Sequence, residues 1–326
     1  MIISKTPFRL SLFGGGTDLP SYLNRSSRGM CIGFALDKFC YIFFRNSNYN
    51  LDYKYRISYS KIELKKSIEK VNHPSVRHTA KFFKYSYPFD LGYHGDLPAR
   101  SGLGSSSSFT VGMCNIFRYV LKKKITPLNL AKDAIHIEQN LINEKVGFQD
   151  QIFAAYGGLN SIEFKKKSFT VNKIRINNYN KSLLEDSIVL VHTNQTRIAS
   201  NIEKNKSFNM ESKLKYYEEI LKCADEFKSD LKNNKIDIKK TGEMLDFTWN
   251  RKKKLSNLVT NKSINELYNY FKSNGAYGGK LMGAGGGGFM MFILNRKNKN
   301  KILKKIKNIS VACKIFDKGS TIIAMD

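Results

Sequence analysis

A glycine- and serine-rich segment at residues 98–108 constrains the fold of this chain more than any other feature. It reads Pro-Ala-Arg-Ser-Gly-Leu-Gly-Ser-Ser-Ser-Ser and leads into a mostly apolar run at residues 109–117, which predicts a loop that opens a helix. Glycines let the backbone approach a ligand closely, and the first N–H groups of a helix have no intrahelical partner, so together they can bind an anion. No Gly-Lys-Ser/Thr follows, as it would in a Walker A loop. The segment therefore predicts another kind of loop for nucleoside triphosphates; a serine-rich cap on an ordinary helix is the alternative.

Two other glycine-rich segments lie near the ends of the chain. Residues 5–20 form an alternating, strand-like run that carries Arg9 and includes Gly-Gly-Gly-Thr-Asp at residues 14–18. Residues 279–294 hold a glycine run between apolar residues, followed by an apolar strand. Flexible linkers mix glycine with serine and other polar residues. The apolar setting instead favours a tight loop that touches a ligand.

In this order, and spanning nearly the whole chain, the three segments resemble those of the GHMP kinases, named for galactokinase, homoserine, mevalonate and phosphomevalonate kinases. Residues 9–20, 147–151 and 283–289 look most like the bacterial branch that acts on D-glycero-D-manno-heptose 7-phosphate. Galactokinase-like chains end the first segment with Gly-Glu-His-Thr-Asp. That ending is missing from the first segment here, which counts against galactose.

The mixture of strand-like and helix-like runs predicts an α+β fold rather than a doubly wound sheet. The resemblance implies a ribosomal-protein-like N-terminal domain at residues 1–185, a ferredoxin-like C-terminal domain at residues 186–326, and an active site between them. We expect helices at 73–85, 105–123, 127–143 and 151–156, and long polar helices between 200 and 275. We expect strands within 1–60, including one strand end and one strand start at 32–44, a hairpin at 159–175, and a strand at 187–193.

The resemblance also implies a catalytic pair. Asp150 matches the family's catalytic aspartate, and a carboxylate there can accept the proton of an attacking sugar hydroxyl. The alternative is an aspartate that caps the short helix at 151–156. Arg9 matches the cation that would lie beside Asp150 and stabilise charge on the transferred phosphoryl group. Its alternative is an arginine at a strand edge.

Two further residues match the family's Mg²⁺ ligands. Ser106, the second serine after Gly104, matches the coordinating hydroxyl, and in a run of four serines this role could slip by one position. Glu138 matches the coordinating carboxylate and lies twelve residues before Asp150 (150 − 138), with an offset of one residue from the family spacing. A solvated glutamate on a helix is the alternative for Glu138.

The other candidate residues are nucleotide and substrate contacts. For the nucleotide, the resemblance implies Pro98, Gly102, Leu103, Gly104, Ser105, Ser106 and Ser107. For the sugar, it implies Gly15, Gly16, Thr17, Asp18, Gly285 and Gly286. Asp18 could instead be a turn aspartate that needs no ligand. A sugar phosphate needs a second anion site, for which an arginine fork is well suited, and the candidates are Arg28, Arg77 and Arg197. Arg100 stands where the family usually has a small residue.

The composition sets limits on partners. The formal net charge of +28 invites a nucleic-acid interpretation, but the excess lies in scattered lysine-rich stretches without a nucleic-acid-binding motif. We expect no nucleic-acid partner.

The five cysteines are far apart, with no Cys-x-x-Cys pair, and are interpreted as reduced buried thiols. No signal-like segment or long apolar run is present, so we expect a soluble, cytoplasmic protein without a membrane partner. The sequence leaves a homodimer open.

These observations lead to one main functional hypothesis. The chain is expected to be an ATP- and Mg²⁺-dependent kinase that phosphorylates the anomeric C1 hydroxyl of D-glycero-D-manno-heptose 7-phosphate. The 1,7-bisphosphate would supply nucleotide-activated heptose for capsule or lipopolysaccharide glycans. The alternatives are another GHMP sugar kinase, such as one for L-fucose, and a sugar sensor of this fold without catalysis. A further alternative, a basic RNA-binding protein, is supported by the net charge alone.

Overall fold

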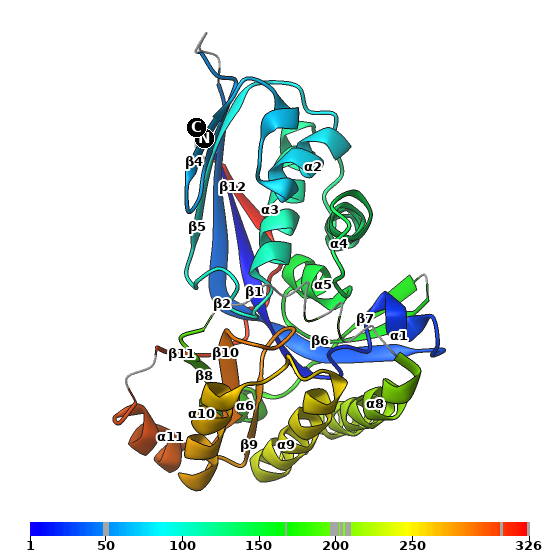
Figure 1. Cartoon of the computed structure of the whole chain (residues 1–326), viewed down its shortest axis with the longest axis vertical. Helices are drawn as coiled ribbons and strands as arrows, with labels where there is room; N and C mark the ends of the chain where they lie inside the picture. Colours follow the sequence, from blue (N-terminus) through cyan, green and yellow to red (C-terminus); the bar gives the residue numbers. More distant parts are fainter. Residues whose placement is uncertain are drawn as a thin grey trace.

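The computed structural model describes residues 1–47, 52–166, 168–195, 202, 205, 210–306 and 309–324. Figure 1 shows an elongated molecule in which a large sheet with helices on one face fills one half, and a smaller sheet with its own helices fills the other. The glycine loop between strands β9 and β10 lies where the two halves meet.

The strands form two sheets. The larger sheet contains β1 (Ile2–Phe13), β2 (Gly29–Asn46), β3 (Tyr55–Ser58), β4 (Ile62–Lys65), β5 (Phe89–Gly95), β6 (Leu159–Lys165), β7 (Ser168–Lys173) and β12 (Thr321–Ala324). The smaller sheet contains β8 (Ile188–His192), β9 (Gly278–Leu281), β10 (Phe289–Ile293) and β11 (Ser310–Ala312).

The helices are distributed over both halves. They are α1 (Pro20–Leu23), α2 (Pro74–Phe82), α3 (Ser105–Val120), α4 (Pro127–His136), α5 (Gln149–Tyr156), α6 (Asn178–Ser187), α8 (Met210–Lys232), α9 (Ile238–Leu255), α10 (Lys262–Ser273) and α11 (Arg296–Leu303). A 3-10 turn, η1 (Ile68–Lys70), precedes α2, and a π-helical segment, η2 (Ile137–Leu141), continues α4.

The larger sheet has the order β12-β1-β2-β5-β3-β4, with β6 paired to β2 and β7 paired to β6. All its pairs are antiparallel except β3 with β5. The smaller sheet has the order β11-β8-β10-β9 and is antiparallel throughout. Strands and helices are thus segregated within each half, as the sequence predicted for an α+β fold.

Strand β2 carries the irregularity that matters most for the site. Its register against β1 shifts so that Pro7 lies opposite Phe39, whereas Arg9 lies opposite Ala35. A bulge of this kind bends a strand and increases its twist. One end of β2 pairs with β6 and the other with β5. The bend therefore occurs beside Arg9.

The expected break within residues 32–44 was wrong, because β2 is continuous through them. The polar residues Asp37 and Lys38 lie at the bulge of β2. The backbone there finds partners outside β1: the Asp37 N–H donates to the Lys314 carbonyl at 3.1 Å. Backbone contacts made by a distant segment therefore keep the chain extended where the local pattern predicts a turn.

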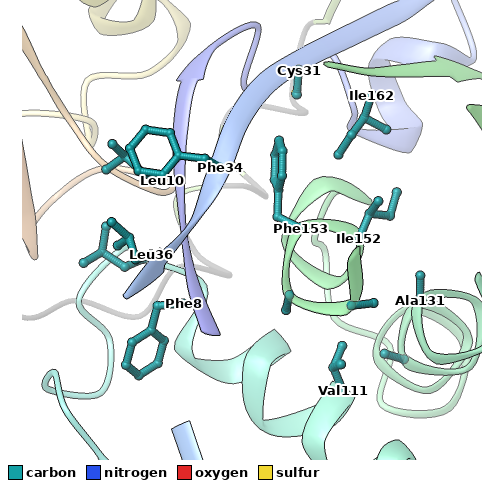
Figure 2. Close-up of a cluster of buried hydrophobic side chains, with 14 of the residues drawn as sticks. Phe8, Leu10, Cys31, Phe34, Leu36, Val111, Ala131, Ile152, Phe153 and Ile162 are labelled. Carbon is teal, nitrogen blue, oxygen red and sulfur yellow. The ribbon is translucent and has the colours of Figure 1, made fainter. Parts of the chain in front are cut away.

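Helix α5 packs tightly on the bent strands. Figure 2 shows Phe153 of α5 beside Cys31 of β2 and Ile152 of α5 near Ile162 of β6, while Phe34 extends from the opposite face of β2. All five side chains are fully buried. A Cβ atom built at Gly33 would lie 3.1 Å from the ring of Phe153, so the glycine permits this close approach. The packing fixes α5, and with it Asp150, against β1.

Most predicted elements are confirmed within a few residues at their ends. Thr126 caps α4, because its side chain accepts a hydrogen bond from the Asn129 N–H. The hairpin at 159–175 corresponds to β6 and β7, and the glycine at position 157 ends α5. The expected domain boundary after residue 185 falls inside α6, and β12 returns to pair with β1, so the division remains a prediction.

The five cysteines are all buried and unpaired in the described structure, in agreement with reduced thiols. Across the residues that the structure describes, no helix has the length and apolar character needed to cross a membrane.

Candidate active site

A cavity of about 390 Å³ lies where the two halves of the molecule meet. Its wall brings together all three glycine-rich segments and the segment around Asp150. The lining residues are Arg9, Ser11, Gly15, Gly16, Asp18, Leu19, Arg100, Gly102, Gly104, Ser105, Ser106, Ser107, Glu144, Val146, Gly147, Gln149, Asp150, Tyr217, Lys252, Leu255, Lys280, Leu281, Met282, Gly283, Ala284, Gly285 and Gly287.

The segment at residues 98–108 is a loop that opens α3, as predicted. Gly104 is the N-cap residue of α3, and both Gly102 and Gly104 have left-handed backbones, with φ of 77° and 78°. Because Gly104 has no side chain, no side-chain cap covers the first N–H groups of α3. These N–H donors and the positive end of the helix dipole therefore form a part of the cavity wall that is suited to phosphate oxygens.

Arg9 ties the loop to Asp150. Its Nε and Nη2 atoms donate to the two carboxylate oxygens of Asp150, each at 2.7 Å, and its Nη1 donates to the Gly102 carbonyl at 2.8 Å. The Arg9 N–H donates to the Leu103 carbonyl at 3.1 Å. Two parallel charge-assisted hydrogen bonds fix both side chains. Arg9 is 4% exposed, whereas the Asp150 side chain is 27% exposed toward the cavity.

The position of Asp150 excludes the simple alternative for it. Phe148 is the N-cap of α5, and Asp150 lies within the first turn of that helix. Its carboxylate is bound by Arg9 rather than by an N–H of the helix start. The alternative for Arg9, an arginine at a strand edge, is also excluded, because Arg9 is buried in the wall of the cavity.

Asp18 holds the segment that carries Asp150. Its carboxylate accepts hydrogen bonds from the Gln149 N–H at 3.1 Å, from Gln149 Nε2 at 2.9 Å and from the Gly16 N–H at 3.0 Å. A Cβ atom at Gly147 would lie 1.9 Å from Asp18 Oδ2, so only glycine fits there. Burial raises the pKa of Asp18. Asp18 is therefore more than a turn residue, since it positions the start of α5.

Glu138 lies in the π-helical segment η2. Glu138 Oε2 accepts from Ser107 Oγ at 2.9 Å and from Gln151 Nε2, while the buried Oε1 has no hydrogen-bond partner. Burial raises the pKa of Glu138 to about 7, and the charge of Glu144 adds to this. Glu138 is 1% exposed, so the solvated alternative is wrong.

The glycine loop between β9 and β10 packs, backbone against backbone, on the loop at residues 98–104, which is called the phosphate loop after the role that the resemblance implies. A Cβ atom at Gly283 would lie 2.8 Å from Gly102 Cα, and one at Gly288 would lie 2.4 Å from the Ser101 carbonyl oxygen. The Phe289 N–H donates to that same carbonyl at 2.9 Å. The two loops thus join the halves of the molecule at the cavity.

The structure brings most of the predicted residues to the cavity, with some exceptions. Ser106 is exposed in the cavity wall, but the hydroxyl that contacts Glu138 belongs to Ser107, one position further on. Apart from the three arginines, five predicted residues do not line the cavity: Pro98, Leu103, Thr17, Glu138 and Gly286. Thr17 is buried and donates to the carbonyls of Gly14 and Met30.

Two of the three arginines proposed for a substrate phosphate lie outside the cavity wall. Arg28 is about half exposed and pairs with Asp225 of α8, with Nη1 at 3.1 Å from Oδ1. Arg77 of α2 donates to the Val71 carbonyl. Both guanidinium groups serve local structure instead of facing the cavity. Arg197 lies outside the described residues.

Several lining residues had no sequence signal strong enough to find them. Lys280 reaches the cavity from β9, and Lys252 from α9, where its Nζ donates to the carbonyls of Leu281 and Gly283 at 2.7 and 2.6 Å. Glu144 and Tyr217 also line the cavity. The chain has many lysines, so only their positions in the tertiary structure distinguish Lys280 and Lys252 from the others.

Comparisons with known proteins agree with this site. The model of the GHMP kinases N terminal domain matches residues 72–158, and that of the GHMP kinases C terminal region matches residues 218–310. The chain is 32% identical to D-glycero-alpha-D-manno-heptose 7-phosphate kinase of Campylobacter jejuni over 324 residues, which cover 94% of this chain and 93% of that protein.

Two solved structures show the same fold. A sugar kinase from Campylobacter jejuni is 28% identical with a TM-score of 0.71, covering 99% of this chain and 98% of that one. The crystal structure of a D-glycero-D-manno-heptose 1-phosphate kinase from Bacteroides thetaiotaomicron is 22% identical with a TM-score of 0.81, covering all of both chains. The predicted fold class is confirmed.

The contact between Gly104 and the catalytic pair can be tested by substitution. An alanine Cβ at position 104 would lie 3.1 Å from Arg9 Cγ and 3.4 Å from Asp150 Oδ2, on a backbone with φ of 78°. We expect Gly104→Ala to lower the free energy of unfolding by about 1–2 kcal/mol and to weaken ATP binding, as measured by urea denaturation and calorimetry.

Gly92→Ala is the matched control, because its Cβ would meet Phe43 Cβ at an ordinary 3.8 Å and its φ is not positive. This variant should keep ATP affinity unchanged. Equal ATP affinity in both variants would contradict the assigned role of Gly104.

Proposed function

This chain belongs to the GHMP kinases and is an ATP-dependent kinase, and on that premise we propose that it phosphorylates the anomeric C1 hydroxyl of D-glycero-D-manno-heptose 7-phosphate. The product would be the 1,7-bisphosphate. The observation that carries the proposal is the 32% identity to a heptose 7-phosphate kinase along 94% of this chain. The Arg9–Asp150 pair beside the phosphate loop supports it, since it places a carboxylate where an acceptor hydroxyl would meet the nucleotide.

Asp150 is the proposed general base. Its carboxylate faces the cavity and can accept the proton of the sugar hydroxyl as that oxygen attacks the γ-phosphorus. Arg9 fixes the orientation of the carboxylate through two hydrogen bonds. The N–H groups at the start of α3 and the hydroxyls of Ser105 and Ser106 would bind the phosphates of ATP.

A Mg²⁺ ion fits the residues around Glu138. The buried Oε1 of Glu138 has no hydrogen-bond partner, and the Ser107 hydroxyl lies 2.9 Å from Oε2. Carboxylate and hydroxyl oxygens are the donors that this hard cation prefers. When bound, Mg²⁺ neutralises charge on the phosphate oxygens of the nucleotide. We propose that Glu138 and Ser107 hold it, one position beyond the expected Ser106.

Arg197 is the proposed partner of the acceptor's own phosphate. Arg28 and Arg77 pair elsewhere. The described chain leading to Arg197 adjoins the glycine loop, because the Gly288 N–H donates to the Gln195 carbonyl at 2.8 Å and Thr193 Oγ1 donates to the Gly288 carbonyl at 2.9 Å. A guanidinium offers a fork of N–H donors that matches the oxygens of a phosphate.

A panel of acceptors tests the proposed substrate. ADP release is measured with D-glycero-D-manno-heptose 7-phosphate, mannose 6-phosphate, L-fucose, galactose, mevalonate and homoserine. We expect the heptose phosphate to give the highest kcat/KM and mannose 6-phosphate to follow. Loss of one charge-assisted contact costs about 1.5–3 kcal/mol, so unphosphorylated sugars should be much poorer. Faster turnover of free fucose or galactose would overturn the sugar-phosphate assignment, and no turnover at all would favour a sensor.

The role of Asp150 is tested by Asp150→Asn. General-base catalysis contributes about 10²–10⁴-fold, so kcat should fall by that factor while ATP still binds. Asp133→Asn is the matched control, since Asp133 is a similarly enclosed carboxylate that accepts from Arg118 Nε at 2.6 Å, away from the cavity. If the kcat of Asp150→Asn were close to that of the control, Asp150 would not be the general base.

The metal assignment is tested by Mg²⁺ titration of Glu138→Gln, Ser107→Ala and Ser106→Ala. The first two variants should need more Mg²⁺ for half-maximal activity, because each loses an oxygen ligand. Mn²⁺ binding in the presence of ATP, followed by electron paramagnetic resonance, should weaken in the same two variants. A higher Mg²⁺ requirement in Ser106→Ala but not in Ser107→Ala would instead assign the metal-binding hydroxyl to Ser106.

A further inference from the structure

Lys280 is a buried cation in the cavity wall that the proposed mechanism leaves without a role. It extends from β9 of the smaller sheet, is 8% exposed, and its Nζ donates to the Leu12 carbonyl of β1 at 2.6 Å. This hydrogen bond links the two halves of the molecule. An ammonium group carries three donors, and this bond uses one of them.

The charge of Lys280 has no counter-charge in the protein. Among the described residues, no carboxylate lies within ion-pair distance of its Nζ. Its charged neighbour is Arg9, and the nearby titratable group on β2 is the Cys31 thiol, whose pKa burial raises well above its ordinary value. A buried, unpaired ammonium is costly to keep in a protein. Such a group is expected to meet an anion in the working complex.

The other cations of the cavity are less suited to that anion. Arg9 is balanced by the carboxylate of Asp150, to which two of its nitrogens donate. Lys252 is only partly buried, and its Nζ is bound to two carbonyls of the glycine loop. Arg100 is exposed at the rim. Lys280 is the most deeply buried unbalanced charge in this wall, and it lies next to the Arg9–Asp150 pair.

We propose that Lys280 contacts the phosphoryl group as it passes from ATP to the acceptor, with its two remaining donors on the oxygens of that group. The proposal rests on the proposed kinase reaction. Negative charge is spread over the oxygens of the phosphoryl group in the transition state, and a fixed cation in a dry site stabilises it without reorganisation. The bond to the Leu12 carbonyl fixes the ammonium group in the cavity wall.

The test compares Lys280→Met and Lys280→Arg with Lys299→Met. Lys299 is a partly buried lysine of α11 whose Nζ also donates to backbone carbonyls, those of Asp186 and Ile188 at 2.7 and 2.8 Å, and it lies outside the cavity. Each variant is assayed with the acceptor that the wild-type protein phosphorylates best, and with ATP alone. Binding of Mg²⁺ with a non-hydrolysable ATP analogue is measured by calorimetry.

We expect Lys280→Met to lose about 10²–10³-fold in kcat, with the affinity for the ATP analogue kept within a few fold and thermal stability close to that of Lys299→Met. A kcat equal to that of Lys299→Met would overturn the proposal. If Lys280→Met does not fold, Lys280→Gln, which retains a donor for the Leu12 carbonyl, is judged by the same criterion. A different best acceptor would overturn the proposed substrate and leave the role of Lys280 standing.

The pH profile supplies an independent readout. Burial lowers the pKa of Lys280 to about 7; the Cys31 thiol opposes this shift and Arg9 adds to it. The charged form is needed, so kcat/KM of the wild-type protein should fall as the pH rises through about 7. Lys280→Arg should keep its activity to higher pH, since guanidinium stays charged. An alkaline limb that is unchanged in both Lys280 variants would also overturn the proposal.

Discussion

The bidentate pair of Arg9 and Asp150 is the interaction on which the arrangement of the site depends. It joins β1 to the first turn of α5, and Arg9 also bonds the carbonyls of Gly102 and Leu103 in the phosphate loop. Three segments far apart in the chain therefore meet at one guanidinium. Breaking a buried pair leaves an uncompensated charge, so the geometry of the base and that of the phosphate loop are fixed together.

Close backbone contact between the two glycine loops is the second constraint. Gly283 and Gly288 lie so close to Gly102 and Ser101 that a Cβ atom at either glycine would clash with the backbone of the other loop. The loops belong to different halves of the molecule, so this contact sets how the halves meet. It also brings Lys280 and Lys252 of the second half to the cavity that the first half opens. The site is thus built by an interface rather than by one domain.

The sequence predicted the local elements around the site correctly. The loop that opens α3 and the capped helix that begins at Pro127 follow from short patterns, because capping, glycine conformation and periodicity are local effects. The continuous β2 was missed, since its bulge is stabilised by backbone bonds to residues near Lys314. Lys280 was missed because one lysine among many carries no local signal of burial.

By itself, the sequence predicted the glycine-rich loop that opens α3, and its resemblance to the GHMP kinases implied an aspartate with an arginine and a glutamate with a serine hydroxyl. The tertiary structure alone decided which hydroxyl meets Glu138, because Ser107 of α3 and Glu138 of η2 come together only through the packing of these two segments. It also decided that Arg28 and Arg77 serve other contacts and that Lys280 lies in the wall. Charge placement is a property of how distant segments pack, and no local pattern records it.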